Sequence, residues 1–176
     1  ECDTPTPAGV AGFLFDDDHF IGNRHAYYDW RNSCLDRVIA THAGIPISLS
    51  VLMIEVARRV GVELVGIGMP THFLVGVADD PDTLFDPFAG GRVLDRDQAR
   101  AMFIDLTRGQ VPWQDAYLDP TPNRDIVIRM LNNLKSVFAG RSDAVRLGVV
   151  MGLRATIPEL AEVEDAEIVA TTAIFN

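Results

Sequence analysis

The sequence predicts an α+β fold in which a central helix packs on a small antiparallel sheet and a helical hairpin follows. The chain has 176 residues, 48% of them apolar and 23% charged, which is enough for a globular domain with a hydrophobic core. An apolar helical segment, 46–60, precedes three short extended runs between residues 62 and 88. Two further helical segments, 126–139 and 143–155, complete the predicted order.

The first 19 residues predict a flexible N-terminal arm. Prolines and glycines between residues 5 and 12 interrupt any sustained hydrophobic period. The acidic run 16–18 lacks the spacing of a calcium-binding loop, so we expect a solvated loop there. The chain begins at Glu1, with no basic leader before an apolar run, which we interpret as a trimmed or processed start.

Two helices are predicted next. Asn32 or Ser33 can cap a short amphipathic helix that Gly44 ends. Pro46 suits the first turn of a second helix, which ends at Gly61. This second helix is apolar on most of its faces, so we expect it to be central and buried.

Extended segments follow the central helix. Residues 62–68, 73–77 and 84–88 predict three strands, and Asp95 can cap a helix after them. A polar connector over 107–122 then leads to the two last helices.

The pattern therefore predicts a core over 20–106, with the connector and helical hairpin of 107–176 packed on it. Gly140 and Ser142 mark the turn between the two helices of the hairpin.

Charge and cysteine content exclude several classes of function. Lys and Arg number 15 against 25 Asp and Glu, and the net charge of −10 opposes binding to nucleic acid or to anionic membranes. The most apolar segment, 45–56, contains polar residues and is too short to span a membrane. Cys2 and Cys34 are too few for a disulfide scaffold or a four-cysteine metal site, so we expect a cytoplasmic protein without metal or cofactor.

Several ordered segments carry a resemblance to a known family. They are Phe20-Ile21-Gly22-Asn23, Tyr28-Asp29, Asn32-Ser33-Cys34-Leu35, Gly44-Ile45-Pro46-Ile47-Ser48-Leu49-Ser50, Glu55-Val56-Ala57-Arg58-Arg59-Val60-Gly61, Pro70-Thr71-His72-Phe73-Leu74 and Asp86-Pro87-Phe88-Ala89-Gly90-Gly91. Together they resemble the SirB-type transglutaminase-like proteins. Residues 122–138 look like the tetratricopeptide-like helices that follow in that family. The resemblance implies a transglutaminase or papain-like core and says less about activity, because members often lose catalytic residues.

The wider superfamily transfers acyl groups through Cys, His and Asp, and the resemblance assigns the last two roles to His72 and Asp86. A histidine stabilises the thiolate and later protonates the leaving amine, while an aspartate fixes the tautomer of the histidine. Because the two residues lie fourteen positions apart on successive predicted strands, a hairpin can bring imidazole and carboxylate together. The alternative is a histidine at a strand edge and an aspartate that caps a turn before Pro87.

The nucleophile is less well matched. The superfamily places it at the start of the central helix, where this chain has Pro46, Ile47 and Ser48 and no thiol. Cys34 instead begins the preceding helix, where the helix dipole is expected to lower its pKa. The alternatives are a buried, inert Cys34 and a Ser48 hydroxyl that bonds to the backbone.

The residues leave three functions open. The first is a degenerate, non-catalytic module that binds a protein or peptide in the old active-site cleft, with Tyr27, Tyr28 and Trp30 either lining that cleft or lying in the core. The second is a thiol acyl transferase or peptidase acting on peptide or glutamine amides through Cys34. The third is assembly through the helical hairpin.

Overall fold

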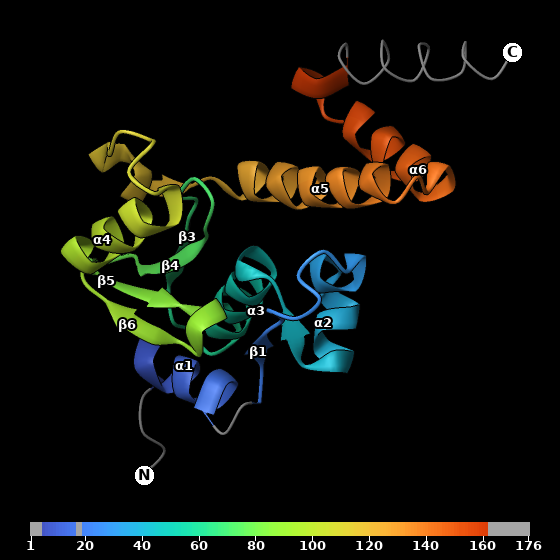
Figure 1. Ribbon diagram of the computed structural model, residues 1–176. Helices are drawn as coiled ribbons and strands as arrows, with labels where there is room; N and C mark the ends of the chain where they lie inside the picture. Colours follow the sequence, from blue (N-terminus) through green and yellow to red (C-terminus); the bar gives the residue numbers. More distant parts are fainter. Residues whose placement is uncertain (1–4, 17–18, 162–176) are drawn as a thin grey trace, which may run out of the picture. The chain divides into compact units, whose positions relative to one another are not determined.

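The computed structural model describes residues 5–16 and 19–161 of the chain (Figure 1). The chain divides into two compact units, residues 1–126 and 127–176. The helices of the first unit are α1 (Pro7–Phe15), α2 (Leu35–Thr41), α3 (Pro46–Arg59) and α4 (Arg96–Thr107), with short 3-10 turns η2 (Trp30–Ser33), η3 (Pro87–Ala89) and η4 (Asp115–Leu118). In the part that is described, no helix is both long and apolar enough to cross a membrane.

An antiparallel sheet forms the middle of the first unit. Its strands lie in the order β6 (Arg92–Leu94), β5 (Asp80–Asp86), β4 (Leu74–Val77), β3 (Leu64–Ile67) and β7 (Pro120–Thr121). A separate parallel pair joins β1 (Ile21–Gly22) to β2 (Ala43–Gly44). The predicted α+β class is confirmed.

Two hydrophobic layers cover the two faces of the sheet (Figure 1). Successive side chains of a strand point to opposite faces. Leu74 and Leu84 therefore pack with α4, through Phe103, while the neighbouring Val75 and Phe85 pack with α1 and α3. The central helix is predicted correctly: α3 begins at Pro46 and is buried on most of its length.

The N-terminal arm is the clearest difference from the sequence prediction. Residues 7–15 form α1, which is capped by Thr6 and has Pro7 in its first turn. Val10, Leu14 and neighbouring side chains are buried in the layer that α3 shares. Gly9 and Gly12, which suggested a loose arm, lie three positions apart within α1 and leave one side of this helix without side chains there. Of the acidic run, Asp17 and Asp18 lie outside the described residues.

Smaller differences concern element ends. The η2 turn occupies the predicted cap positions, so that Cys34, and not Asn32 or Ser33, is the N-cap residue of α2. That helix ends at His42 in a left-handed conformation (φ 55°), two residues before Gly44. The short strands β6 and β7 were not predicted, because three-residue and two-residue segments carry too little hydrophobic period to be recognised.

The second unit contains most of α5 (Asn123–Gly140), which begins in the first unit, and α6 (Ala144–Ala155). Ser142 turns the chain with φ 55°, and the Asp143 side chain caps α6 by accepting from the backbone N–H of Arg146. Arg154 donates to the side chain of Asn132, twenty-two positions earlier. This bond joins α6 to α5, as expected for a helical hairpin.

Candidate functional site

His72 and Asp86 form a buried pair at one end of the sheet. The imidazole Nε2 lies 3.0 Å from Oδ1 of the carboxylate. His72 is 8% exposed and Asp86 is 4% exposed. The geometry is that of an oriented imidazole, whereas the catalytic role of the pair stays a prediction.

The strand register explains why these residues meet. Val75 of β4 lies opposite Phe85 of β5, so His72, just before β4, comes near Asp86, the last residue of β5. Thr71, with φ 69°, supplies the left-handed turn that brings the chain into β4. The resemblance had singled out these two residues, and their spacing across a hairpin allows the contact because a hairpin register fixes which residues face each other.

The carboxylate of Asp86 also holds the following turn. Its Oδ1 accepts from the backbone N–H groups of Phe88 and Ala89 at 3.0 and 3.2 Å, so Asp86 caps η3 as well as binding His72. Both of the interpretations offered by the sequence thus describe this residue. Since a carboxylate only accepts, the imidazole donates from Nε2 in this contact, and in a neutral ring the unprotonated nitrogen would then be Nδ1. This is the tautomer that an acyl transferase would use as a base through Nδ1.

Ser48 is fully buried and its hydroxyl is committed to the backbone. Its Oγ accepts from the N–H of Ile45 at 3.1 Å, and its proton has the carbonyl oxygens of Asn32 at 2.6 Å and Ile45 at 3.1 Å within reach. The hydroxyl closes the first turn of α3 in the manner of a capping box. No hydrogen bond joins it to His72 in the described part of the chain.

Cys34 is partly buried at the junction of η2 and α2. Burial raises the pKa of its thiol, and the carboxylate of Asp36 raises that pKa further, against a smaller opposite effect of Arg37. The expected lowering of the pKa by the helix start is therefore wrong. A helix of only seven residues with an acidic residue in its first turn offers a thiolate little stabilisation.

Asn32 organises the loop before the candidate site, which the sequence prediction missed by treating it as a helix cap. Its side chain is 3% exposed. The amide donates to the carbonyl oxygens of Ala26 and Tyr27 at 2.7 and 3.1 Å and accepts from Asn23 at 3.0 Å. The backbone carbonyl oxygen of Asn32 accepts from the Ser48 hydroxyl. Asn32 therefore connects residues 23–27 to the N-terminus of α3.

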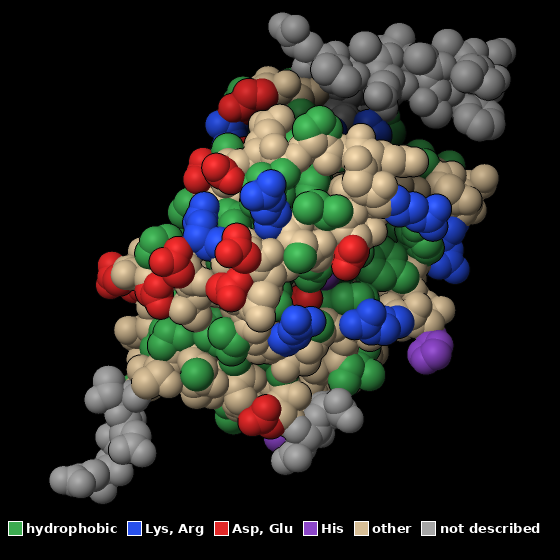
Figure 2. Space-filling view, turned by 60° about the vertical axis from the view of Figure 1, so that its left-hand side comes forward, with side chains coloured by type: hydrophobic (Ala, Val, Ile, Leu, Met, Phe, Trp, Pro, Cys, Tyr) green, Lys and Arg blue, Asp and Glu red, His purple; other side chains and the backbone are tan. Residues whose placement is uncertain are grey.

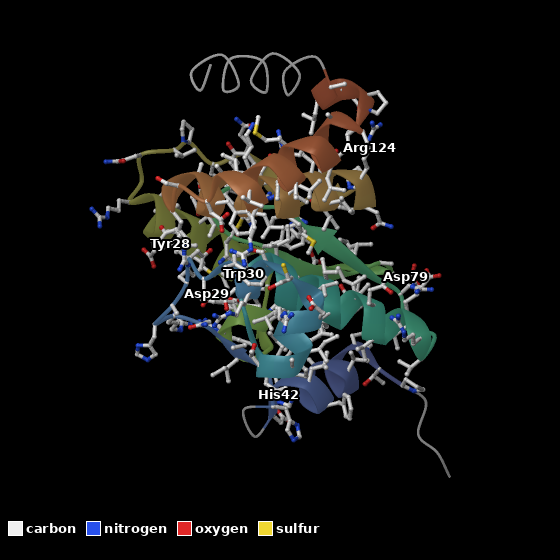
Figure 3. The ribbon with its side chains drawn as sticks, turned by 90° about the vertical axis from the view of Figure 1, so that its right-hand side faces the viewer. Tyr28, Asp29, Trp30, His42, Asp79 and Arg124 are labelled. Atoms are coloured by element: carbon white, nitrogen blue, oxygen red, sulfur yellow. The ribbon has the colours of Figure 1, made fainter. Side chains whose placement is uncertain are left out.

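An aromatic cluster extends from His72 toward solvent. The ring of Phe88 lies 6.2 Å from the imidazole of His72 and 5.9 Å from the ring of Tyr27, both edge to face. Tyr27 in turn contacts Tyr28, which is 77% exposed. The exposed position of Tyr28, which Figure 3 shows close to Asp29 and Trp30 and far from Asp79, places this residue at the surface and not in the core.

A separate groove of about 800 Å³ lies between α1 and α3. Its lining residues, Pro5, Thr6, Gly9, Val10, Phe13, Val56 and Val60, include no titratable side chain. The groove therefore offers no acid–base chemistry. Within the described ranges, no three His, Cys, Asp or Glu side chains lie close enough to share a metal ion.

Charged side chains are unevenly distributed on the face drawn in Figure 2. On the face drawn in Figure 2, acidic side chains gather toward the left, and basic side chains lie among them and to their right. Although the net charge of the chain is −10, basic side chains are therefore exposed on this face.

Comparison with known proteins agrees with this fold. A UPF0162 protein of Xylella fastidiosa is 45% identical over 136 residues, which cover 75% of this chain and 48% of that protein. A UPF0162 protein of Vibrio cholerae is 30% identical over 121 residues, covering 68% of this chain and 44% of that protein. The chain thus spans about half the length of these relatives.

A shorter similarity reaches a eukaryotic protein. F-box only protein 21 of Homo sapiens is 42% identical over 62 residues, which are 35% of this chain and 10% of that protein. No solved structure matches the chain. The family description that matches, "Transglutaminase-like superfamily", covers residues 6–132, which include the whole His72–Asp86 region. The chain therefore belongs to the transglutaminase-like superfamily.

Proposed function

We propose that this transglutaminase-like domain is a non-catalytic module that binds a protein or peptide beside the His72–Asp86 pair. The observation that carries the proposal lies at the N-terminus of α3. Ser48 is buried there, and its hydroxyl is hydrogen-bonded to backbone groups of Ile45 and Asn32. That position is where the superfamily resemblance places the nucleophile. A serine can attack a carbonyl only when its oxygen faces both a base and the substrate.

The environment of Cys34 supports the same proposal. A thiol whose pKa is raised is mostly protonated at neutral pH, and the thiolate is the reactive form. Its electrostatic neighbours are Asp36 and Arg37, on its own helix. The proposal thus combines an imidazole held by a carboxylate with the lack of an activated nucleophile among the candidates Ser48 and Cys34.

Binding in place of catalysis fits the rest of the site. His72 and Asp86 hold Phe88 in position through the η3 turn, and Phe88 begins the aromatic cluster that reaches the surface. Exposed aromatic side chains on a rigid support are a common basis of peptide recognition.

The proposal is tested by two measurements on the full chain. We expect no incorporation of a biotinylated primary amine into casein and no release of ammonia from glutamine peptides. We also expect linear peptides selected from a random display library to bind the chain, with weaker binding to His72→Ala and unchanged binding to His42→Ala, an exposed histidine. Amine incorporation that disappears in Cys34→Ala, or a library that yields no binder, would overturn the proposal.

The His72–Asp86 geometry favours one second candidate, a Cys-His-Asp acyl transferase or amidase. In that reaction the Cys34 sulfur attacks the carbonyl carbon of an amide, and the thiol proton passes to Nδ1 of His72. The C–N bond breaks as His72 returns the proton to the leaving amine, and water or another amine then resolves the thioester. If Cys34→Ala keeps any amidase signal of the chain, this mechanism is excluded.

A further inference from the structure

We propose that Arg24, which lies over the Phe88 ring that Tyr27 also contacts, binds an Asp or Glu side chain of the peptide, next to an aromatic or aliphatic residue that packs on the tyrosine. This inference rests on the proposed function, because it names the chemistry of the peptide that the module takes.

Arg24 is exposed and its guanidinium carbon lies 4.9 Å from the centre of the Phe88 ring. No carboxylate of the described residues forms an ion pair with it. Stacking on a ring leaves the edge of the guanidinium, with its five N–H donors, free for a planar partner. A carboxylate is the partner that matches this fork in shape and charge.

Several other arginines form ion pairs within the domain, whereas Arg24 is held over an aromatic ring. Arg31 lies 3.5 Å from Asp29, and Arg58 and Arg59 both bind Glu55 at 2.9 Å. Their charges are already neutralised within the domain. Among the described residues, Arg24 thus has no carboxylate partner, and its positive charge is available to an acidic group of a ligand.

The stack is built into the fold and not formed by chance at the surface. A Cβ added at Gly22 would meet the Phe88 carbonyl oxygen at 2.4 Å and its ring at 2.6 Å, so glycine lets β1 approach this ring. The side chain of Asn23 accepts from the N–H of Ala26 at 3.0 Å, and Asn32 holds the same loop. A receptor that is ordered before binding loses less entropy when the ligand arrives.

The position of Phe88 next to the buried His72–Asp86 pair sets the direction in which a peptide would lie on the site. Phe88 donates its backbone N–H to the same Asp86 oxygen that holds His72. A peptide lying on Tyr27 and Phe88 would therefore place its acidic group at Arg24 and its neighbouring apolar group along the tyrosines, with His72 in edge-to-face contact with the Phe88 ring.

The test uses the full chain and a display library of random linear peptides, followed by synthesis of the selected peptides with amidated C-termini. Amidation removes the terminal carboxylate, so that only side-chain carboxylates remain as partners. The chain is compared with Arg24→Gln and Arg24→Lys, and with Arg100→Gln as the matched control. Arg100 is an exposed arginine of α4, which packs on the other face of the sheet.

We expect the selected peptides to be enriched in Asp or Glu beside an aromatic or aliphatic residue. Arg24→Gln should weaken their binding about tenfold or more, as expected for loss of a charged hydrogen bond, Arg24→Lys less, and Arg100→Gln not at all. Exchange of the peptide's Asp or Glu for its amide should weaken binding to the chain and not to Arg24→Gln.

Two results would overturn the inference. Peptides without acidic enrichment that bind the chain and Arg24→Gln equally, but depend on His72, would leave the proposed function standing and remove the role of Arg24. A library with no binder would remove both. Circular dichroism of each variant establishes that it is folded, and Tyr27→Phe, which keeps the ring contact, should bind as the chain does.

Discussion

At the scale of single residues, the candidate site contains two kinds of side chain: buried ones that stabilise the fold and exposed ones that face solvent. Ser48 and Asn32 are buried and satisfied by hydrogen bonds, whereas Arg24 and Tyr28 are exposed and rest on other side chains. A ligand can therefore contact the exposed side chains of Arg24 and Tyr28, but not those of Ser48 and Asn32.

Ser48→Ala is expected to destabilise the domain. The change leaves the N–H of Ile45 and the carbonyl of Asn32 without their buried partner, which costs about 1–3 kcal/mol of unfolding free energy. Urea denaturation should show this loss, while Ser136→Ala, at an exposed position of α5, should change stability by about 0.5 kcal/mol or less. Unchanged stability of Ser48→Ala would mean that the hydroxyl does not close the α3 turn.

Cys34 is expected to react with iodoacetamide as a hindered, poorly ionised thiol. Burial and Asp36 raise its pKa, so the rate should rise with pH only above the midpoint found for the same cysteine in denaturant. The measurement is the pH dependence of alkylation, read by peptide mass spectrometry. A midpoint below that of the denatured chain, lost again in His72→Ala, would instead reveal a thiolate–imidazolium pair.

At the scale of elements, the prediction succeeded where a segment is long and periodic. The helix α3, the cap of α4 at Asp95 and the hairpin of α5 and α6 follow from apolar spacing and capping residues alone. The pairing of His72 with Asp86 followed from the hairpin between them. Short elements failed, since β6 and β7 are defined by tertiary pairing and not by local pattern.

The helix α1 and the neighbourhood of Cys34 could not be predicted for physical reasons. Helix propensity disfavours the glycines of α1, yet burial of Leu14 and Phe15 against α3 outweighs that cost. The pKa of Cys34 depends on how deeply the η2 turn buries it, which no local pattern encodes. The stack of Arg24 on Phe88 joins residues sixty-four positions apart and left no signal in the sequence.

The last turn of α3 has a pH-dependent contact. Glu55 accepts from Arg58 and Arg59 at 2.9 Å, and these hydrogen bonds lower the pKa of its carboxyl group. Because the folded pKa lies below the unfolded one, the stabilisation is present above the unfolded value of about 4.3 and is lost as pH falls through the folded pKa.

The expected result is a stability difference between the chain and Glu55→Gln that is constant near neutral pH and shrinks in acid. Denaturation at a series of pH values measures it, with Glu63→Gln as the matched control. High salt should reduce the difference, since the ion pairs are exposed. A difference that grows in acid would contradict the assignment.

At the scale of the whole molecule, the first unit is expected to unfold in one step although it has two hydrophobic layers. Phe85 lies in the layer of α1 and α3, and Phe103 lies in the layer of α4, but the same strands supply side chains to both. Phe85→Ala and Phe103→Ala should each lower the unfolding free energy by about 3–5 kcal/mol.

The measurement is denaturation followed by tryptophan fluorescence and by circular dichroism. Trp30 and Trp113 report from different places, and the ring of Trp113 contacts that of Phe103 edge to face, with 5.3 Å between the ring centres. Coincident transitions in both variants are expected, and Val93→Ala, at an exposed position, should leave them unchanged. Separate transitions would show that each layer folds independently.

The alternation of side chains along β4 and β5 makes the domain intolerant of length changes in its middle. Leu74 and Val75 are neighbours in the chain, yet they belong to different layers. Inserting one residue between them would turn the side chains on one side of the insertion to the opposite face of the sheet. It would also move His72 out of register with Asp86. Length changes are therefore expected to be tolerated in turns such as the one at Asp79, which leave the paired residues of β4 and β5 in register, and not within the two strands.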